Sequence, residues 1–180
     1  NALAAVAVGL ELEVAFPHVA SALEDFRGVG RRFETRGEAG GVRVVDDYGH
    51  HPTEVAATLA AARTLGRRVL VLVQPHRYTR TALLHREFGA CFAGADRVFV
   101  LDVYAAGETP VPGVSARTIV ESAEALGQRQ LVYVGGAAAA LEAVARAVRA
   151  GDLVLPLGAG DVWRLGDRLR ERLGGKAGGR

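Results

Sequence analysis

The sequence has 180 residues, of which 49% are apolar and 23% are charged, and its formal net charge at pH 7 is +2. This composition is typical of a folded globular protein and excludes a disordered one. The charge gives no reason to expect nucleic acid as a partner, and no apolar run approaches the roughly 18 residues of a membrane-spanning helix. No signal peptide is visible, so we expect a cytoplasmic protein without a membrane partner.

Two residue counts indicate that the chain is part of a longer protein. It contains no methionine, which predicts that Asn1 lies inside a longer gene product. Its one lysine, Lys176, lies in the glycine-rich stretch 174–179. A phosphate-binding loop of the form Gly-x-x-x-x-Gly-Lys-Ser/Thr would therefore have to lie upstream. We expect this chain alone to be inactive as an ATP-hydrolysing enzyme.

The first 27 residues are predicted to form two helices. Apolar residues repeat every three or four positions in residues 4–12 and again in residues 19–26. Gly28 and Gly30 then interrupt the pattern. A domain boundary is therefore predicted at residue 30, with one domain covering 1–30 and a second covering 31–180.

Beyond residue 30 the sequence alternates between strand and helix patterns. The candidate strands are residues 31–35, 42–45, 69–73, 98–101, 131–134 and 153–155. The first two are expected to pair as a hairpin, and the others are short apolar runs, as expected of strands buried on both faces. Helices are predicted from Pro52 to Gly66 and around 84–91, 119–126, 141–148 and 162–173, followed by a flexible glycine-rich tail. The pattern predicts a mainly parallel, Rossmann-like α/β sheet with helices on both faces.

Three of the candidate strands end in unusually polar segments, which are residues 46–51, 74–80 and 102–108. Three of the five histidines fall in the first two of these segments. In an open parallel sheet, ligands bind beyond the carboxyl ends of the strands. The sequence therefore predicts a binding site on this edge of the sheet.

The residue types in these segments suggest which ligands could bind. Arg77 and Arg80 are three residues apart at a helix start, so their guanidinium groups suit a carboxylate or phosphate. Tyr48, His50 and His76 could orient a small amine or carry a proton near neutral pH. The alternative is that the two arginines only form surface salt bridges with nearby acidic residues. The clustering of both histidine-rich loops on one edge favours the binding site.

The residues also bear on a metal site and on a dinucleotide site. A protein-bound metal is not expected, because the adjacent His50 and His51 would point to opposite sides of an extended segment. The segment Gly158-Ala159-Gly160-Asp161 is a fragment of a dinucleotide-binding fingerprint, but its third glycine, Gly166, is misplaced. A tight turn is the better interpretation, and a non-catalytic nucleotide-binding α/β module remains an alternative.

Three motifs resemble those of the Mur ligases, and in particular of the alanine-adding members of that family. They are Asp-Asp-Tyr-Gly-His-His-Pro-Thr-Glu (46–54), Gln-Pro-His-Arg-Tyr-Thr-Arg-Thr (74–81) and Asp-Val-Tyr-Ala-Ala-Gly-Glu (102–108). The opening segment 1–5 and the segment 30–34 are similar to the same family. The resemblance thus runs from the end of a central ATPase domain through the C-terminal domain. A murein-peptide recycling ligase of this family is the nearest alternative, but its second motif reads Pro-Arg-Ser-Asn-Thr.

The resemblance implies an ATP-dependent ligase that joins L-alanine to the carboxylate of UDP-N-acetylmuramate through an acyl phosphate, a step of peptidoglycan precursor synthesis. ATP and Mg²⁺ would be bound mainly by the central domain upstream. The resemblance implies no catalytic residue on this chain, and Glu108 has no assigned role. The positions that match family binding residues are Asn1, Arg32 and Asp47 for ATP, and Tyr48, His50, His76, Arg77 and Arg80 for alanine and the acyl end of the nucleotide sugar.

Overall fold

The computed structural model describes residues 2–26 and 28–177, and the chain divides into two compact units, residues 1–30 and 31–180. The first unit contains two helices, α1 (Ala2–Glu11) and α2 (Phe16–Asp25), as predicted. Neither helix buries a residue, and Leu3, Phe16 and Phe26 leave 85%, 56% and 60% of their surface exposed. Two helices of this length cannot enclose an apolar core of their own.

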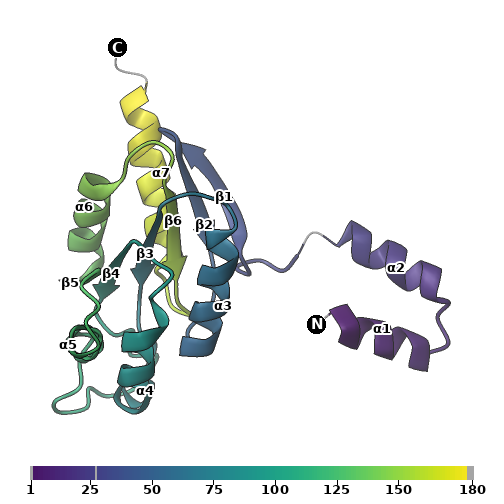
Figure 1. The fold of residues 1–180 in the computed structure, drawn as a ribbon, viewed down its shortest axis with the longest axis horizontal. Coiled ribbons are helices and arrows are strands. Elements are labelled where there is room, and N and C mark those ends of the chain that lie inside the picture. The colour runs from purple at the N-terminus through teal and green to yellow at the C-terminus, as the bar shows by residue number, and fades with distance from the viewer. Residues whose placement is uncertain (1, 27, 178–180) are drawn as a thin grey trace. The chain divides into compact units, whose positions relative to one another are not determined.

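The second unit is built on one six-stranded sheet. Its strands are β1 (Glu34–Ala39), β2 (Val42–Asp46), β3 (Val69–Val73), β4 (Arg97–Leu101), β5 (Leu131–Gly135) and β6 (Leu153–Leu157). They lie in the order β1-β2-β6-β3-β4-β5 (Figure 1). Only β1 and β2 pair antiparallel, and every other pair is parallel. The predicted mainly parallel α/β sheet is confirmed.

Helices cover both faces of this sheet (Figure 1). One face carries α3 (Pro52–Arg63), α4 (Tyr78–Cys91) and α5 (Arg117–Ala125), and the other carries α6 (Ala137–Ala147) and α7 (Trp163–Ala177). The sequence of strand β3 is a continuous apolar run because both of its faces are buried. Val69, Val71 and Val73 belong to the first core cluster, whereas Leu70 and Leu72 belong to the second. No helix in the described part of the chain is long and apolar enough to cross a membrane.

The last strand of the chain, β6, lies in the middle of the sheet. It pairs with β3 from Leu153 to Leu157 and with β2 at two positions, Leu153 and Val154. Pro156 has no N–H to donate, and it falls where the pairing with β2 is interrupted before a bridge between Asp47 and Leu157. Strand β6 therefore continues through a proline at which the sequence pattern predicted its end.

Boundaries near the two ends of this unit also differ from the prediction. The first strand begins at Glu34 instead of Arg31, because Arg31 and Phe33 adopt φ values of +59° and +49° that a strand does not allow. Helix α7 continues through Gly174 and Gly175 to Ala177, beyond the helix end predicted at residue 173.

Two glycine substitutions are expected to change stability in opposite directions. A Cβ at Gly89 would lie 2.8 Å from the backbone nitrogen of Ala123, so Gly89→Ala should push α4 from α5 and lower the free energy of unfolding by about 1–3 kcal/mol. A Cβ at Gly174 would meet nothing within 4 Å, so Gly174→Ala should raise it by up to about 1 kcal/mol through helix propensity. Urea unfolding of the 180-residue chain measures both changes, and a Gly89→Ala variant as stable as the wild type would contradict the close α4–α5 contact.

Candidate functional site

The predicted site lies where four segments meet at the carboxyl edge of the sheet. Backbone hydrogen bonds join them in order across the sheet. Gly158 N donates to Asp47 O at 3.3 Å, Gln74 N donates to Leu157 O at 3.0 Å, and Tyr104 N donates to Pro75 O at 2.8 Å. The segments that follow β2, β6, β3 and β4 are therefore held side by side.

Four aromatic rings form a row along this edge, which we call the ring row and define as Tyr48, His50, His76 and Tyr104. The ring centroids of Tyr48 and His50 are 5.3 Å apart, edge to face. Those of His50 and His76 are 5.9 Å apart, and Tyr104 stacks on His76 at 5.6 Å. The structure thus brings together the three predicted ring residues and adds Tyr104, which was not predicted as a site residue.

Arg77 and Arg80 stand at the start of α4, directly after His76. Arg77 is the N-cap residue and has a φ of +73°, a conformation that costs a non-glycine residue on the order of 1–3 kcal/mol. Such strain is characteristic of positions whose side chain or backbone has a specific task. Arg80 is half-buried, and its Nη1 is shielded from solvent without a hydrogen-bond partner among the described residues.

His76 shares this environment. Its Nδ1 is likewise shielded and has no hydrogen-bond partner among residues 2–26 and 28–177. Burial lowers the pKa of His76, and the charges of Arg80, His50 and Arg77 lower it further, while Glu108 acts in the opposite direction. The imidazole is therefore neutral at pH 7. The folded state resists this protonation more than the unfolded chain does, so this group destabilises the fold as the pH falls below 6.5.

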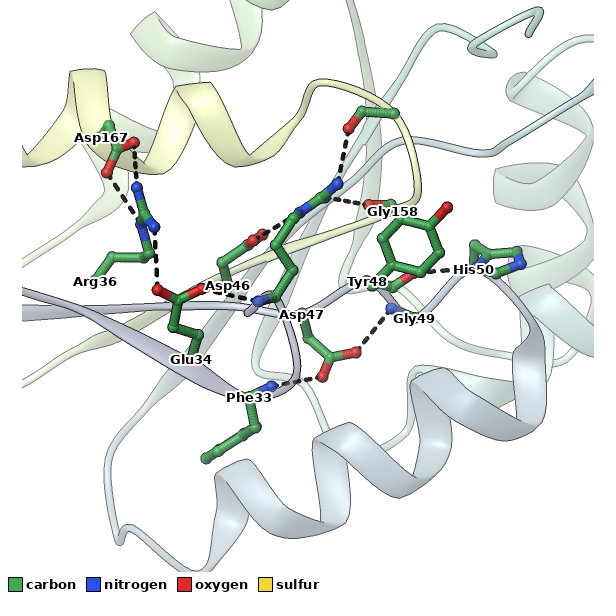
Figure 2. A network of polar contacts seen from close by, with 12 residues as sticks. Phe33, Glu34, Arg36, Asp46, Asp47, Tyr48, Gly49, His50, Gly158 and Asp167 are labelled. Atoms are coloured by element: carbon green, nitrogen blue, oxygen red, sulfur yellow. Dashed lines mark hydrogen bonds and ion pairs between the residues drawn. The ribbon is translucent and has the colours of Figure 1, made fainter. Parts of the chain in front are cut away.

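A buried polar network anchors the loop that carries Tyr48 and His50 (Figure 2). Asp47 is 6% exposed, and its carboxylate accepts hydrogen bonds from Phe33 N and Gly49 N, both at 2.8 Å, and from Thr58 Oγ1 at 3.1 Å. Both oxygens of Asp47 thus serve the fold, tying the entry to β1, the 47–50 loop and α3 together.

Asp46, next to it, is paired with Arg31. Arg31 Nε donates to Asp46 Oδ2 at 2.9 Å, and Arg31 Nη2 donates to the carbonyl oxygen of Gly158 at 2.6 Å. Burial raises the pKa of Asp46, and the hydrogen bond and charge of Arg31 oppose this shift. Arg31 therefore fastens the start of the second unit to the ends of β2 and β6, a role that the sequence did not reveal.

The three residues predicted to bind ATP have different positions. Arg32 is exposed, and its guanidinium lies 5.4 Å from the centroid of the Tyr48 ring. Asp47 faces the interior, as described above. Asn1 lies outside the described residues.

Glu108 provides the cap that α4 lacks. Arg77, at the N-cap, makes no side-chain capping bond, but Glu108 Oε2 accepts from Thr79 N at 3.1 Å and Glu108 Oε1 accepts from Thr79 Oγ1 at 2.6 Å. Tyr104 and Glu108 both belong to the third polar segment, so the sequence marked their segment without indicating their roles. In the described part of the chain, no group of three or more His, Cys, Asp or Glu side chains could hold a metal ion.

The lowered pKa of His76 can be tested by substitution on α4. Arg80→Gln removes the largest charge acting on His76, so the pKa of His76 should rise towards its ordinary value. Arg86→Gln makes the same charge change on an exposed part of α4 and should leave it unchanged. Titration of the histidine ring signals by NMR measures both, and an identical pKa in the Arg80→Gln variant would show that the charge of Arg80 does not contribute to the shift.

Comparison with known proteins gives relatives named UDP-N-acetylmuramate–L-alanine ligase. The chain is 53% identical over 174 residues to the UDP-N-acetylmuramate–L-alanine ligase of Solibacter usitatus, covering 96% of this chain and 37% of that protein. The crystal structure of UDP-N-acetylmuramate–alanine ligase from Thermotoga maritima matches with a TM-score of 0.75 and 30% identity, covering 96% of this chain and 36% of that one. The chain thus spans little more than a third of the length of the relatives that it matches.

The same fold occurs in a ligase that carries a different name. A murein peptide ligase from Psychrobacter arcticus matches with a TM-score of 0.73 at 23% identity, covering 97% of this chain and 36% of that one. A family model described as "Mur ligase, glutamate ligase domain" matches residues 31–160, the region that contains the ring row and Arg77 and Arg80. The resemblance drawn from the three motifs is confirmed, and the chain belongs to the Mur ligase family.

Proposed function

We propose that the chain is the C-terminal part of an ATP-dependent ligase that joins L-alanine to the carboxylate of UDP-N-acetylmuramate. The observation that carries this proposal is the pair of shielded, unpartnered nitrogens, Arg80 Nη1 and His76 Nδ1, beside the strained Arg77. Buried polar atoms are normally hydrogen-bonded, so such a pair indicates a place for a ligand. The 53% identity to an enzyme named for this reaction supports the choice of substrates.

An amino acid substrate suits this end of the ring row. Its carboxylate needs a fixed cationic partner, and a guanidinium can bind it through two parallel hydrogen bonds. Its amine must be neutral to attack an acyl group, and the neutral imidazole of His76 can accept a hydrogen bond from it. The protein's contribution here is to hold the amine beside the acyl carbon, because correct orientation alone removes much of the barrier.

The opposite end of the ring row suits the phosphates of ATP. ATP would supply the phosphoryl group that activates the muramyl carboxylate as an acyl phosphate. Arg32 is exposed beside Tyr48 and can neutralise phosphate charge, whereas Asp47 would support this end by fixing the backbone of Phe33 and Gly49. The described residues offer no carboxylate cluster for Mg²⁺, so we place the metal on the upstream domain.

Residues 1–30 are proposed to be the end of the central ATP-binding domain. This assignment is supported by the exposure of the two helices: α1 and α2 bury no residue and leave large apolar side chains exposed. An apolar surface of this kind is normally covered by further protein. The cytoplasm, where ATP is available, is the proposed compartment.

The 180-residue chain alone should not turn over ATP. It has a single lysine, Lys176, and so no Gly-Lys-Ser/Thr segment with which to hold the phosphates. Phosphate release from the purified chain with ATP, Mg²⁺, L-alanine and UDP-N-acetylmuramate should equal the protein-free rate. Magnesium-dependent turnover would contradict the proposal that the upstream domain holds the phosphates of ATP and the metal.

Arg80 should control the use of alanine in the full-length ligase. Removing one partner of a desolvated charge pair costs about 2–5 kcal/mol, so Arg80→Ala should raise the KM for L-alanine by roughly 30-fold or more. Arg80→Lys should recover only part of this, since a point charge does not reproduce the planar fork of arginine. Steady-state kinetics at saturating ATP measure both variants. Arg86→Ala on the same helix is the matched control, and an alanine KM that stays constant in Arg80→Ala would leave Arg80 as a structural residue.

A further inference from the structure

We propose that Glu108 is a positioning residue for the amino acid substrate, holding the start of α4 so that Arg77 and Arg80 face the substrate carboxylate. This inference rests on the function proposed above and adds a residue to its amino acid site. Glu108 itself does not need to touch the substrate. It acts through Thr79, with which it makes two hydrogen bonds.

The contact between Glu108 and α4 has the chemistry of a helix cap. The amides of the first helical turn have no partner within the helix, and the helix dipole places partial positive charge there. Glu108 brings a carboxylate to this point from a segment 29 residues further along the chain. The hydrogen bonds from Thr79 lower the pKa of Glu108, so its charge is retained at neutral pH.

A tight turn between β4 and Glu108 brings the carboxylate to this position. Glu108 N donates to Ala105 O at 3.0 Å, and the two residues between them, Ala106 and Gly107, have φ values of +50° and +85°. Two consecutive positive φ values are the pattern of a type I′ turn, which reverses the chain sharply. The turn leads Glu108 back towards the first turn of α4.

The same pair of loops fixes Arg77. Arg77 N donates to Tyr104 O at 2.8 Å, and Arg77 O accepts from both Thr81 N at 3.1 Å and Thr81 Oγ1 at 2.8 Å. The strained Arg77 is thus held at its N–H by Tyr104 and at its carbonyl oxygen by Thr81. The Glu108 cap holds Thr79, two residues further along. A strained residue keeps its conformation only where its surroundings over-determine it, and Glu108 supplies part of that constraint.

The Glu108 cap also decides which groups of the protein bind the substrate carboxylate. A free helix N-terminus attracts any anion, including the carboxylate of an amino acid. In this fold Glu108 already occupies the start of α4, so the substrate carboxylate is left to the guanidinium groups of Arg77 and Arg80. Without Glu108, the helix amides would compete with those groups for the same carboxylate, and α4 would lose its anchor.

The test compares variants of the full-length ligase by steady-state kinetics. Glu108→Ala should raise the KM for L-alanine about tenfold, with the KM for ATP and kcat changed less than about threefold. Thr79→Val should have a smaller effect in the same direction, because it removes the hydroxyl bond and keeps the backbone N–H bond to Glu108. Thr79→Ser should have almost none, because serine keeps the hydroxyl. The double variant Glu108→Ala/Thr79→Val should be no worse than Glu108→Ala, since Glu108→Ala already removes both hydrogen bonds to Thr79. Glu87→Ala, an exposed acid on α4, is the matched control.

Amide hydrogen exchange on the 180-residue chain tests the contact independently of activity. In Glu108→Ala the Thr79 amide should exchange at least about tenfold faster. An unchanged rate would overturn the contact, and a faster rate with an unchanged alanine KM would overturn the positioning role. Product formation by the wild-type ligase with L-alanine tests the proposed function separately. If the wild type uses another amino acid, that function fails, and the same variants are compared with the amino acid it does use.

Discussion

The site depends on the insertion of β6 between β2 and β3. Because β6 pairs with both neighbours, the segments that follow β2 and β3 lie on either side of its end, at Gly158. Residues 47 and 158 are far apart in sequence, as are residues 74 and 157, yet each pair is joined by a backbone hydrogen bond. Long-range pairings of this kind slow folding, because the entropy of loop closure is lost before the contacts form. The binding edge therefore exists only after the last strand is in place.

Burial of charge imposes the second constraint. Asp46 and Asp47 are 1% and 6% exposed, and buried carboxylates are tolerated only when they are paired or hydrogen-bonded. Asp47 meets this requirement with three donors, and one oxygen of Asp46, Oδ2, meets it with Arg31. The result is that Tyr48 and His50 stand on a loop whose preceding residues cannot shift without leaving a buried charge unpaired. Rigidity at this end of the ring row thus follows from electrostatics more than from apolar packing.

The fold was largely predictable because its strands are buried on both faces. The run Val69–Val73 has no polar alternation, and the strand β3 has these same bounds. The ends that were missed depend on features that residue preference does not record. Pro156 is tolerated in β6 only because the pairing with β2 is interrupted there, and β1 starts late because Arg31 and Phe33 have positive φ. The site was located by the rule that parallel strands share a carboxyl edge, which made the histidine-rich segments neighbours. The roles of Tyr104 and Glu108 needed the register between β3 and β4, and the role of Arg31 needed the position of β6. None of these can be read from one sequence.

In the described part of the chain, the charged side chains along this edge are of two kinds: some are hydrogen-bonded to other groups of the protein, and others are not. Near the end of β2, Arg31 is bound to Asp46 and to Gly158, whereas Arg32 is exposed. Near the start of α4, the carboxylate of Glu108 is bound to Thr79, whereas Arg80 Nη1 has no partner among the described residues. At each end one charged group is hydrogen-bonded within the fold, and the neighbouring guanidinium is the one that we propose for a ligand. Between them stands His76, kept neutral by burial and by the surrounding positive charge. In the proposed reaction, the phosphates of ATP and the carboxylate of alanine are bound at one edge, and the amine of alanine must be uncharged. An edge with a free cation at each end and a neutral imidazole between them meets that requirement, because each anion has its own partner and the amine has a neighbour that does not repel it.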